Sequence, residues 1–302
     1  MILTIFTATY NRAYTLERVY NSLINQKNYK FEWLIVDDGS IDETKTIIEN
    51  FKNNDPPFEI NYIYKLNGGK HSTYEYCSKY AKGEYYISLD SDDELTPNTV
   101  EIAYKYINEI KIRKLDYVAG IVGNVIDHEE NMIGRCLQEN LTPLDYGLFL
   151  LEKNFGDKFE ILRTKLLKEF KFPEANNEKY VPESCYLHQI AKKYKIITIS
   201  HVGTRKWIDK RNDHLNDRYE KNFNREGRRL AYKFILINSY RLVTPYPILM
   251  IKIITEYIIT SIELKILLIE QFKEIENKYS RILWMLAVPI SLVRFIIEKY
   301  KK

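Results

Sequence analysis

Apolar and polar positions follow two different periods along roughly the first 110 residues of the chain. Short apolar runs, which are typical of buried strands, occupy residues 2–7, 31–36, 60–64 and 85–89. Between these runs, apolar residues recur every three to four positions, as on one face of a helix, over residues 15–26, 43–51, 72–81 and 97–112. Strands that alternate with helices predict an α/β fold, with a mostly parallel sheet covered by helices on both faces.

Three of the predicted strands are followed by polar clusters, at residues 7–12, 37–40 and 90–93. Ligands of such sheets bind beyond the carboxyl ends of the strands, so we expect the clusters to converge on one crevice. The last cluster, within LDSDDEL at residues 89–95, places Asp90, Asp92 and Asp93 side by side. Repulsion between these carboxylates favours a bound cation, and Mg²⁺ or Mn²⁺ carrying a substrate's phosphates suits oxygen ligands. The alternative is a solvated acidic turn before the next helix.

Composition narrows the class of protein. The 302 residues are 45% hydrophobic, enough for one large domain with an appendage or for two domains. Lys and Arg number 45 against 41 Asp and Glu; the net charge of +4 is too mild to indicate nucleic acid, and we expect none. Three scattered cysteines favour a reduced, cytoplasmic setting. The chain opens on a strand-like run, so we expect no secretory signal.

Four motifs carry a family resemblance. TATYNR, VDDGSIDET, NGGKH and LDSDDEL resemble, in order and spacing, those of glycosyltransferase family 2 enzymes with the GT-A fold. The resemblance covers residues 1–120 well and residues 120–240 more loosely. It implies a GT-A (Rossmann-like) domain over residues 1–220, followed by a helical region over residues 221–302. It also implies an inverting hexosyltransferase that uses Mn²⁺ or Mg²⁺ and a nucleotide sugar, expected to be UDP-linked.

The resemblance assigns nucleotide-sugar contacts to the polar loops. In the first loop they are Thr7, Tyr10, Asn11 and Arg12, where Tyr10 would stack on the base and Asn11 could instead only hold the turn. Asp38 resembles the carboxylate that reads the uracil or the ribose, whereas Asp37 is expected to be structural. The other expected contacts are Gly69, Lys70, His71, Asp90 and Ser91. Lys70 would meet a phosphate as a point charge. Glu75 stands where the family often has Asn.

Metal ligands and a catalytic base follow from the same resemblance. Asp92 is the preferred metal ligand, then Asp93, with His214 to complete the coordination sphere. The family keeps its base, an Asp or a Glu, at the start of a helix in the second half of the domain. Glu183, in the first turn after Pro182, is our candidate for this base, and Glu178 is the alternative. Acidic residues also favour helix N-termini for electrostatic reasons alone.

The amino-acid composition becomes more apolar from residue 246 onward. Apolar runs occupy residues 248–269 and 282–297, and the second run is shorter than the roughly 20 residues that span a bilayer. We therefore expect helices that lie on a membrane surface, with Trp284 and the terminal lysines at the interface. Core-packing helices or a homo-oligomer contact are the alternatives. A basic cluster at Arg225, Arg228 and Arg229 would bind a phosphate-bearing acceptor or form a solvated helix face.

These expectations combine into two hypotheses of different classes. The first is an enzyme on the inner face of the cytoplasmic membrane that adds a sugar to a glycan or lipid-linked acceptor of a surface polysaccharide, such as capsule or lipopolysaccharide. The second is a non-catalytic nucleotide-sugar-binding scaffold subunit. Such a subunit would be expected to lose the base or the acidic cluster, and this chain keeps both. A nucleotidyltransferase would need a glycine-rich, basic loop after the first strand, which residues 7–12 do not supply.

Overall fold

The structure, a computed structural model, describes residues 2–151, 156–175, 178–207 and 224–300, without the side chains of residues 298 and 299. Two compact units are present. The first comprises the described residues within 1–171 and 193–210, and the second comprises those within 172–192 and 211–302. The domain boundary expected at residue 220 lies outside the described residues.

The first unit is built on a nine-stranded sheet. Its strands are β1 (Leu3–Thr9), β2 (Phe31–Asp37), β3 (Glu59–Tyr64), β4 (Tyr85–Ser88), β5 (Glu94–Leu95), β6 (Val118–Asp127), β7 (Asn140–Asp145), β8 (Phe159–Arg163) and β9 (Lys195–Lys206). The strand order is β3-β2-β1-β4-β8-β6-β9-β5, and β7 pairs with β9. Strands β1 to β4 pair in parallel, as do β6 and β9, whereas β8, β5 and β7 pair antiparallel with their neighbours. The α/β class is confirmed, and the sheet is mixed beyond β4.

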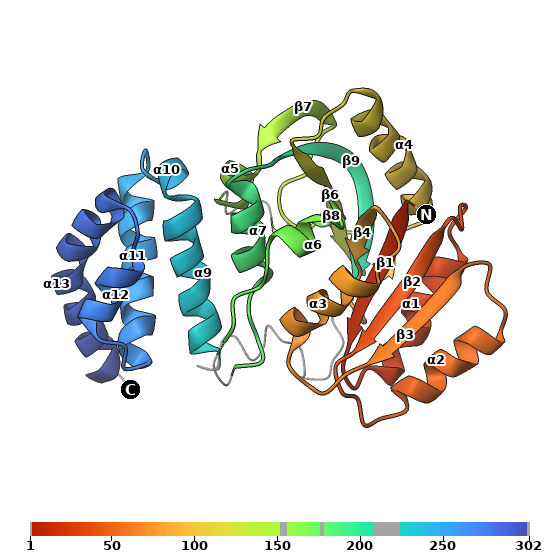
Figure 1. The fold of residues 1–302 in the computed structure, drawn as a ribbon, viewed down its shortest axis with the longest axis horizontal. Coiled ribbons are helices and arrows are strands. Elements are labelled where there is room, and N and C mark those ends of the chain that lie inside the picture. The colour runs from red at the N-terminus through yellow and green to blue at the C-terminus, as the bar shows by residue number, and fades with distance from the viewer. Residues whose placement is uncertain (1, 152–155, 176–177, 208–223, 301–302) are drawn as a thin grey trace. The chain divides into compact units, whose positions relative to one another are not determined.

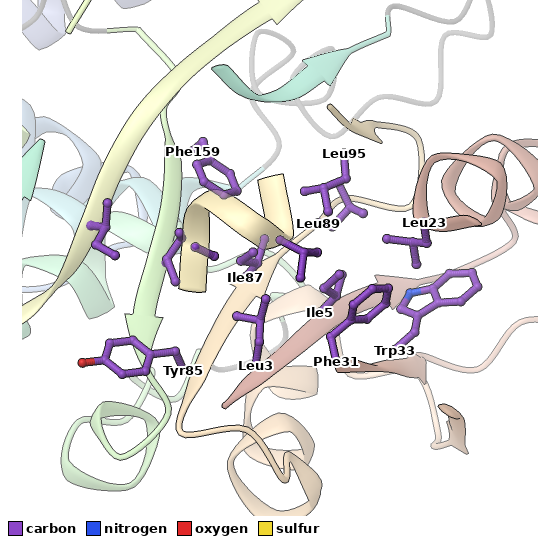
Figure 2. Packing of buried hydrophobic residues seen from close by; sticks show 14 of the residues in the cluster. Leu3, Ile5, Leu23, Phe31, Trp33, Tyr85, Ile87, Leu89, Leu95 and Phe159 are labelled. Atoms are coloured by element: carbon purple, nitrogen blue, oxygen red, sulfur yellow. The ribbon is translucent and has the colours of Figure 1, made fainter. Parts of the chain in front are cut away.

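Helices cover both faces of the parallel strands (Figure 1). They are α1 (Ala13–Ile24), α2 (Thr44–Asn53), α3 (Lys70–Tyr80) and α4 (Thr99–Ile112), with the short helices α5 (Tyr146–Leu151) and α6 (Leu166–Glu169) further on. Leu3 and Ile5 of β1 share one core with Leu23 of α1 (Figure 2). The opposite face of β1 presents Phe6, whose ring centroid lies 5.0 Å from that of Tyr74 on α3. This alternation along β1 is the period of two expected of a strand buried on both sides.

Every strand and helix predicted before residue 112 is present, with ends shifted by a few residues. Helix α3 begins two residues earlier than predicted, directly after Gly69. Gly69 has a φ of 90° and a ψ of 156°, a backbone conformation that is essentially restricted to glycine. The glycine therefore sets the sharp entry into α3, and Lys70 becomes the first helical residue.

The second unit consists of helices in the part of the chain that is described. These are α7 (Glu183–Ala191), α9 (Arg225–Asn238), α10 (Tyr240–Val243), α11 (Pro247–Glu263), α12 (Leu268–Glu274) and α13 (Lys278–Tyr300). Helix α11 packs on α9, α12 and α13, and α7 packs on α9. Val181, Cys185 and Leu230 form a small core where α7 meets α9. The helical C-terminal region predicted from the sequence is confirmed.

The basic cluster of α9 holds this unit together. Arg229 is buried and forms an ion pair with Glu274 on α12. The guanidinium groups of Arg225 and Arg228 lie 3.6 and 3.7 Å from Glu263 at the end of α11. Arg229 is therefore part of the interior of this unit and not of a solvated helix face, whereas Arg225 and Arg228 stay partly exposed beside Glu263.

Helix α13 differs from its prediction in two ways. Trp284 was expected at a membrane interface, but it is buried and packs on Phe272 with ring centroids 5.6 Å apart. The helix begins earlier than the apolar run, so its segment Lys278–Ile297 is, by length and composition, long and apolar enough to cross a membrane. The apolar run of residues 282–297 therefore belongs to a longer helix segment than the sequence pattern predicts.

Candidate functional site

Three carboxylates form a compact cluster in the loop that joins β4 to β5. The oxygens of Asp90, Asp92 and Asp93 include one from each residue that all lie within 4.8 Å of one another. Asp93 is buried, whereas Asp90 and Asp92 are partly exposed. We call these three residues the acid cluster. Its predicted position, beyond the carboxyl end of a central parallel strand, is the one observed.

Cationic side chains surround the acid cluster. The Lys70 ammonium lies 2.5 Å from Oδ1 of Asp90, and the Arg12 guanidinium lies 3.9 Å from Oδ2 of Asp92. Lys206, the last residue of β9, places its ammonium 3.8 Å from Asp90 and 3.7 Å from Asp93. The same ammonium lies 3.0 Å from Asp157. Neither Lys206 nor Asp157 was predicted as a site residue.

The pKa values of two carboxyl groups in the acid cluster are shifted in opposite directions. Burial and the neighbouring charge of Asp90 raise the pKa of Asp93 to about 7. Burial opposes ionisation of Asp90 too, but Lys70 and Lys206 outweigh it and hold the pKa of Asp90 near 2. The cations therefore do not offset the burial of Asp93 and its repulsion from Asp90. Three carboxylates this close together supply the oxygen ligands that a hard divalent cation such as Mg²⁺ or Mn²⁺ prefers.

Hydrogen bonds connect the three polar loops, as their predicted convergence requires. The hydroxyl of Thr15 donates to the carbonyl of Ser91 (2.6 Å), which joins the start of α1 to the acid cluster. The N–H of Asn11 donates to the Ser40 hydroxyl (2.8 Å), and the Asn11 side-chain oxygen accepts the N–H of Ile41 (2.9 Å). Asn11 therefore ties the first loop to the second, which fits the alternative that it holds the turn.

Asp38 organises the loop that precedes α3. Its carboxylate accepts the N–H groups of Gly68 (2.9 Å) and Gly69 (2.7 Å). It also accepts the Lys65 ammonium at 2.5 Å, an ion pair that the sequence did not predict. Asp37 is buried and accepts the hydroxyl of Tyr62 (2.7 Å), in line with its expected structural role. Asp38 thus fixes the glycines that place Lys70 at the acid cluster.

The other predicted residues of the first loop divide into core and surface. The Thr7 side chain is buried, and its hydroxyl accepts the indole N–H of Trp33 at 3.0 Å. A direct ligand contact through that hydroxyl does not fit this arrangement. Tyr10 is 46% exposed, so its ring is accessible to a planar partner. His71 lies in the first turn of α3, beside Lys70.

Trp207, the residue that follows β9, contacts the acid cluster. Its backbone N–H donates to Oδ1 of Asp93 at 3.2 Å. The Arg18 guanidinium lies 4.6 Å from the centroid of the indole, and the ring of His128 stacks on it at 5.6 Å. Arg18 also donates to the carbonyl of Asp92 (2.8 Å). Trp207 therefore anchors the end of β9 next to the carboxylates.

The candidates for the base lie in the second unit. Glu183 is the first residue of α7, as predicted. Glu178 accepts the N–H of Gly227 at 2.6 Å, at the first turn of α9, and burial raises its pKa. This bond gives Glu178 a structural task at a helix N-terminus. His214 lies outside the described residues. His201, on β9, pairs with the Thr99 hydroxyl at 2.9 Å.

Sequence comparison identifies relatives of parts of the chain. The profile of the family "Glycosyl transferase family 2" matches residues 4–139. An uncharacterized glycosyltransferase of Mycoplasma genitalium, MG060, is 37% identical over 110 residues, which are 35% of this chain and 37% of that protein. The GalNAc(5)-diNAcBac-PP-undecaprenol beta-1,3-glucosyltransferase of Campylobacter jejuni is 28% identical over 211 residues, 64% of each protein. The chain thus spans between about a third and two thirds of these relatives.

Solved structures share the fold. Residues 1–349 of S. aureus TarS, in complex with UDP-GlcNAc, superpose with a TM-score of 0.62 at 21% identity, over 96% of this chain and 80% of that one. The mannosyltransferase PcManGT of Pyrobaculum calidifontis, in complex with GDP-Man and Mn²⁺, gives a TM-score of 0.52 at 17% identity, over 80% and 64% of the two chains. Residues 4–139 therefore match glycosyl transferase family 2, and the chain shares the GT-A fold of these solved structures.

Proposed function

We propose that this chain is a metal-dependent, inverting glycosyltransferase that moves a sugar from a UDP-sugar to a glycan or lipid-linked acceptor. The observation that carries the proposal is the acid cluster, which lies at the carboxyl ends of the parallel strands with Lys70 2.5 Å from Asp90. In the similar structures named above, TarS was crystallised with UDP-GlcNAc and PcManGT with GDP-Man and Mn²⁺. These ligands of the similar structures support a nucleotide sugar and a divalent ion as the proposed ligands of this arrangement.

The chain's residues divide the chemistry between them. Asp92 and Asp93 would hold Mn²⁺ or Mg²⁺, which neutralises charge on the departing diphosphate when bound. Lys70 adds a positive charge at the same place. Tyr10 serves the uridine through its exposed ring, and the buried carboxylate of Asp38 holds the glycine loop that places Lys70. Glu183 accepts the proton of the acceptor hydroxyl as that oxygen attacks the anomeric carbon opposite the leaving group, which inverts the configuration.

The acceptor is proposed from the relatives and from α13. The name of the Campylobacter relative includes an undecaprenol-linked acceptor. In this chain α13 exposes apolar side chains along one face, namely Ile282, Leu286, Ile290, Val293, Ile296 and Ile297. Arg294, the one charged residue of this run, pairs with Glu256 of α11 at 2.7 Å. A lipid-linked acceptor at the inner face of the cytoplasmic membrane, in surface polysaccharide assembly, fits a helix with such a face.

A panel of UDP-sugars, assayed for release of UDP with Mn²⁺ or with EDTA, tests the proposal. We expect slow hydrolysis of one donor that requires the metal and is lost in Asp92→Asn. Lys79→Met, a change on an exposed residue at the far end of α3, should leave hydrolysis unchanged. Equal activity in EDTA would remove the role of the metal. Donor binding without hydrolysis or transfer would instead identify a nucleotide-sugar-binding scaffold subunit.

A further inference from the structure

We infer that Lys206 is an internal counter-cation that competes with the divalent metal ion for the acid cluster. In the metal-free protein its ammonium compensates the carboxylates, and this contact lowers the affinity of the cluster for the ion. The inference rests on the proposed function, because it concerns control of the metal site on which that function depends.

Geometry separates Lys206 from the other cations of the site. Lys70 reaches Oδ1 of Asp90, and Arg12 reaches Asp92, so each of them pairs with one member of the acid cluster. Lys206 lies nearly midway between two members, 3.8 Å from Oδ2 of Asp90 and 3.7 Å from Oδ2 of Asp93. A cation that approaches both carboxylates at similar distances repels a second cation that is attracted to the same oxygens.

The backbone that carries Lys206 is held firmly. Lys206 pairs in parallel register with Asp127 of β6. The next residue, Trp207, donates its backbone N–H to Asp93, and its ring contacts Arg18 and His128. The ammonium is therefore delivered to the acid cluster by an ordered strand end, and its only freedom is that of its own side chain.

Asp157 gives the ammonium a second position. It lies 3.0 Å from the ammonium, nearer than either member of the acid cluster, and its side chain is 60% exposed. When a divalent ion takes the oxygens of Asp92 and Asp93, Lys206 can keep its ion pair with Asp157. Displacement of the lysine then breaks its longer contacts with Asp90 and Asp93 and keeps its shorter contact with Asp157. The competition is therefore reversible.

The test compares Mn²⁺ binding to full-length variants without nucleotide, followed by the electron paramagnetic resonance signal of free Mn²⁺. We expect Lys206→Met to lower the dissociation constant for Mn²⁺ by about tenfold or more, because one like charge leaves the site. Lys206→Arg keeps the charge and should stay near wild type. Arg205→Gln is the matched control, because Arg205 lies next to Lys206 on β9 and pairs with Glu94 (3.2 Å) and Glu130 (3.0 Å) instead of the acid cluster. The same loss of charge at this position should leave the affinity for Mn²⁺ unchanged.

A second measurement keeps the inference testable if Mn²⁺ binding is weak. In EDTA, Lys206→Met should melt at a lower temperature than wild type, since the carboxylates lose their counter-cation, and Mn²⁺ should raise its melting temperature by more than it raises that of wild type. If Lys206→Met does not fold, Lys206→Gln removes the same charge and keeps a polar end.

Two results would overturn the inference. An unchanged dissociation constant in Lys206→Met would show that the lysine does not compete, and weaker Mn²⁺ binding would show that it helps to build the metal site. Neither assay contains a nucleotide or an acceptor, so a failure of the glycosyltransferase assignment appears separately, as a lack of UDP release from every donor by a protein that binds Mn²⁺ as predicted.

Discussion

The ammonium of Lys70 lies 2.5 Å from Oδ1 of Asp90, so the first residue of α3 is joined to the loop that follows β4. Lys70 thereby carries a positive charge to the place where the proposed diphosphate would lose its sugar. We expect Lys70→Met to slow metal-stimulated hydrolysis of the donor about 100-fold, which is typical for the loss of one charge-stabilising group. Lys70→Arg should retain part of the rate. UDP release measures both, and full activity in Lys70→Met would exclude Lys70 from the chemistry.

Gly69 makes that placement possible, and its substitution should be costly. At a φ of 90° and a ψ of 156°, an alanine is strained by about 1–3 kcal/mol. We expect Gly69→Ala to lower the free energy of unfolding by this amount and to slow donor hydrolysis, because the loop bound to Asp38 must change. Gly68→Ala is the control: Gly68 is not among the glycines with a positive φ, and its Cβ would meet the Ser72 hydroxyl and the Lys65 ammonium, both at the ends of side chains, and the Ser72 Cβ at an ordinary 3.4 Å. Denaturant unfolding of both variants compares the two effects, and equal losses would contradict a special role for Gly69.

The sequence predicted the parallel half of the sheet well, for a local reason. Buried strands and amphipathic helices of this half alternate at short range, so the periods of the apolar residues locate them without knowledge of the fold. The position of Asp90 beyond β4 followed from the general rule for such sheets.

Lys206 escaped prediction because its place depends on long-range pairing. It belongs to β9, which pairs with β6 in parallel and with β5 and β7 antiparallel. The residue pairs of β9 with β5 are more than 100 positions apart in the chain, and no local pattern in residues 195–206 chooses these partners. Asp157 contacts the same ammonium from the loop before β8, and β8 belongs to the same sheet as β9. The contacts of Lys206 and Trp207 with the acid cluster are therefore visible only in the structure.

Glu183 is expected to be the residue whose loss separates donor binding from transfer. Glu183→Gln keeps the size of the side chain and removes its ability to accept a proton, so transfer to an acceptor should fall about 10²- to 10⁴-fold while UDP-sugar affinity is unchanged. Glu178→Gln is the matched control, since Glu178 accepts the N–H of Gly227. It should lower the melting temperature and leave transfer largely intact. Transfer kinetics beside calorimetric donor binding would distinguish the two residues, and a reversed pattern would make Glu178 the base.

His188 gives the second unit a predictable dependence on pH. Burial lowers its pKa from the ordinary 6.5 to about 4, and its Nδ1 lies 2.8 Å from the Ser239 hydroxyl. Between these two values the unfolded chain binds a proton that the folded chain does not, so stability is lost as the pH falls from 6.5 toward 4, by up to about 3 kcal/mol. The difference in unfolding free energy between pH 7 and pH 4.5 should shrink in His188→Gln. It should not shrink in His128→Gln, which changes an exposed histidine.

The exposed face of α13 should govern attachment to lipid. The side of α13 that packs in the unit carries Ser280, Trp284, Ala287 and Ser291, all buried, and the apolar residues face outward. We expect Leu286→Glu with Val293→Glu to abolish sedimentation of the protein with vesicles that contain anionic lipid, because each carboxylate would have to enter an apolar layer. Both residues are more than half exposed, at 66% and 58%, so the change should spare the fold, which circular dichroism can check. Ile112→Glu changes an equally apolar residue, 77% exposed, at the end of α4 and should leave sedimentation as in wild type. If the double variant still sediments while a light-scattering mass shows that wild-type dimers have dissociated, the face is a contact between copies of the chain and the membrane assignment is wrong.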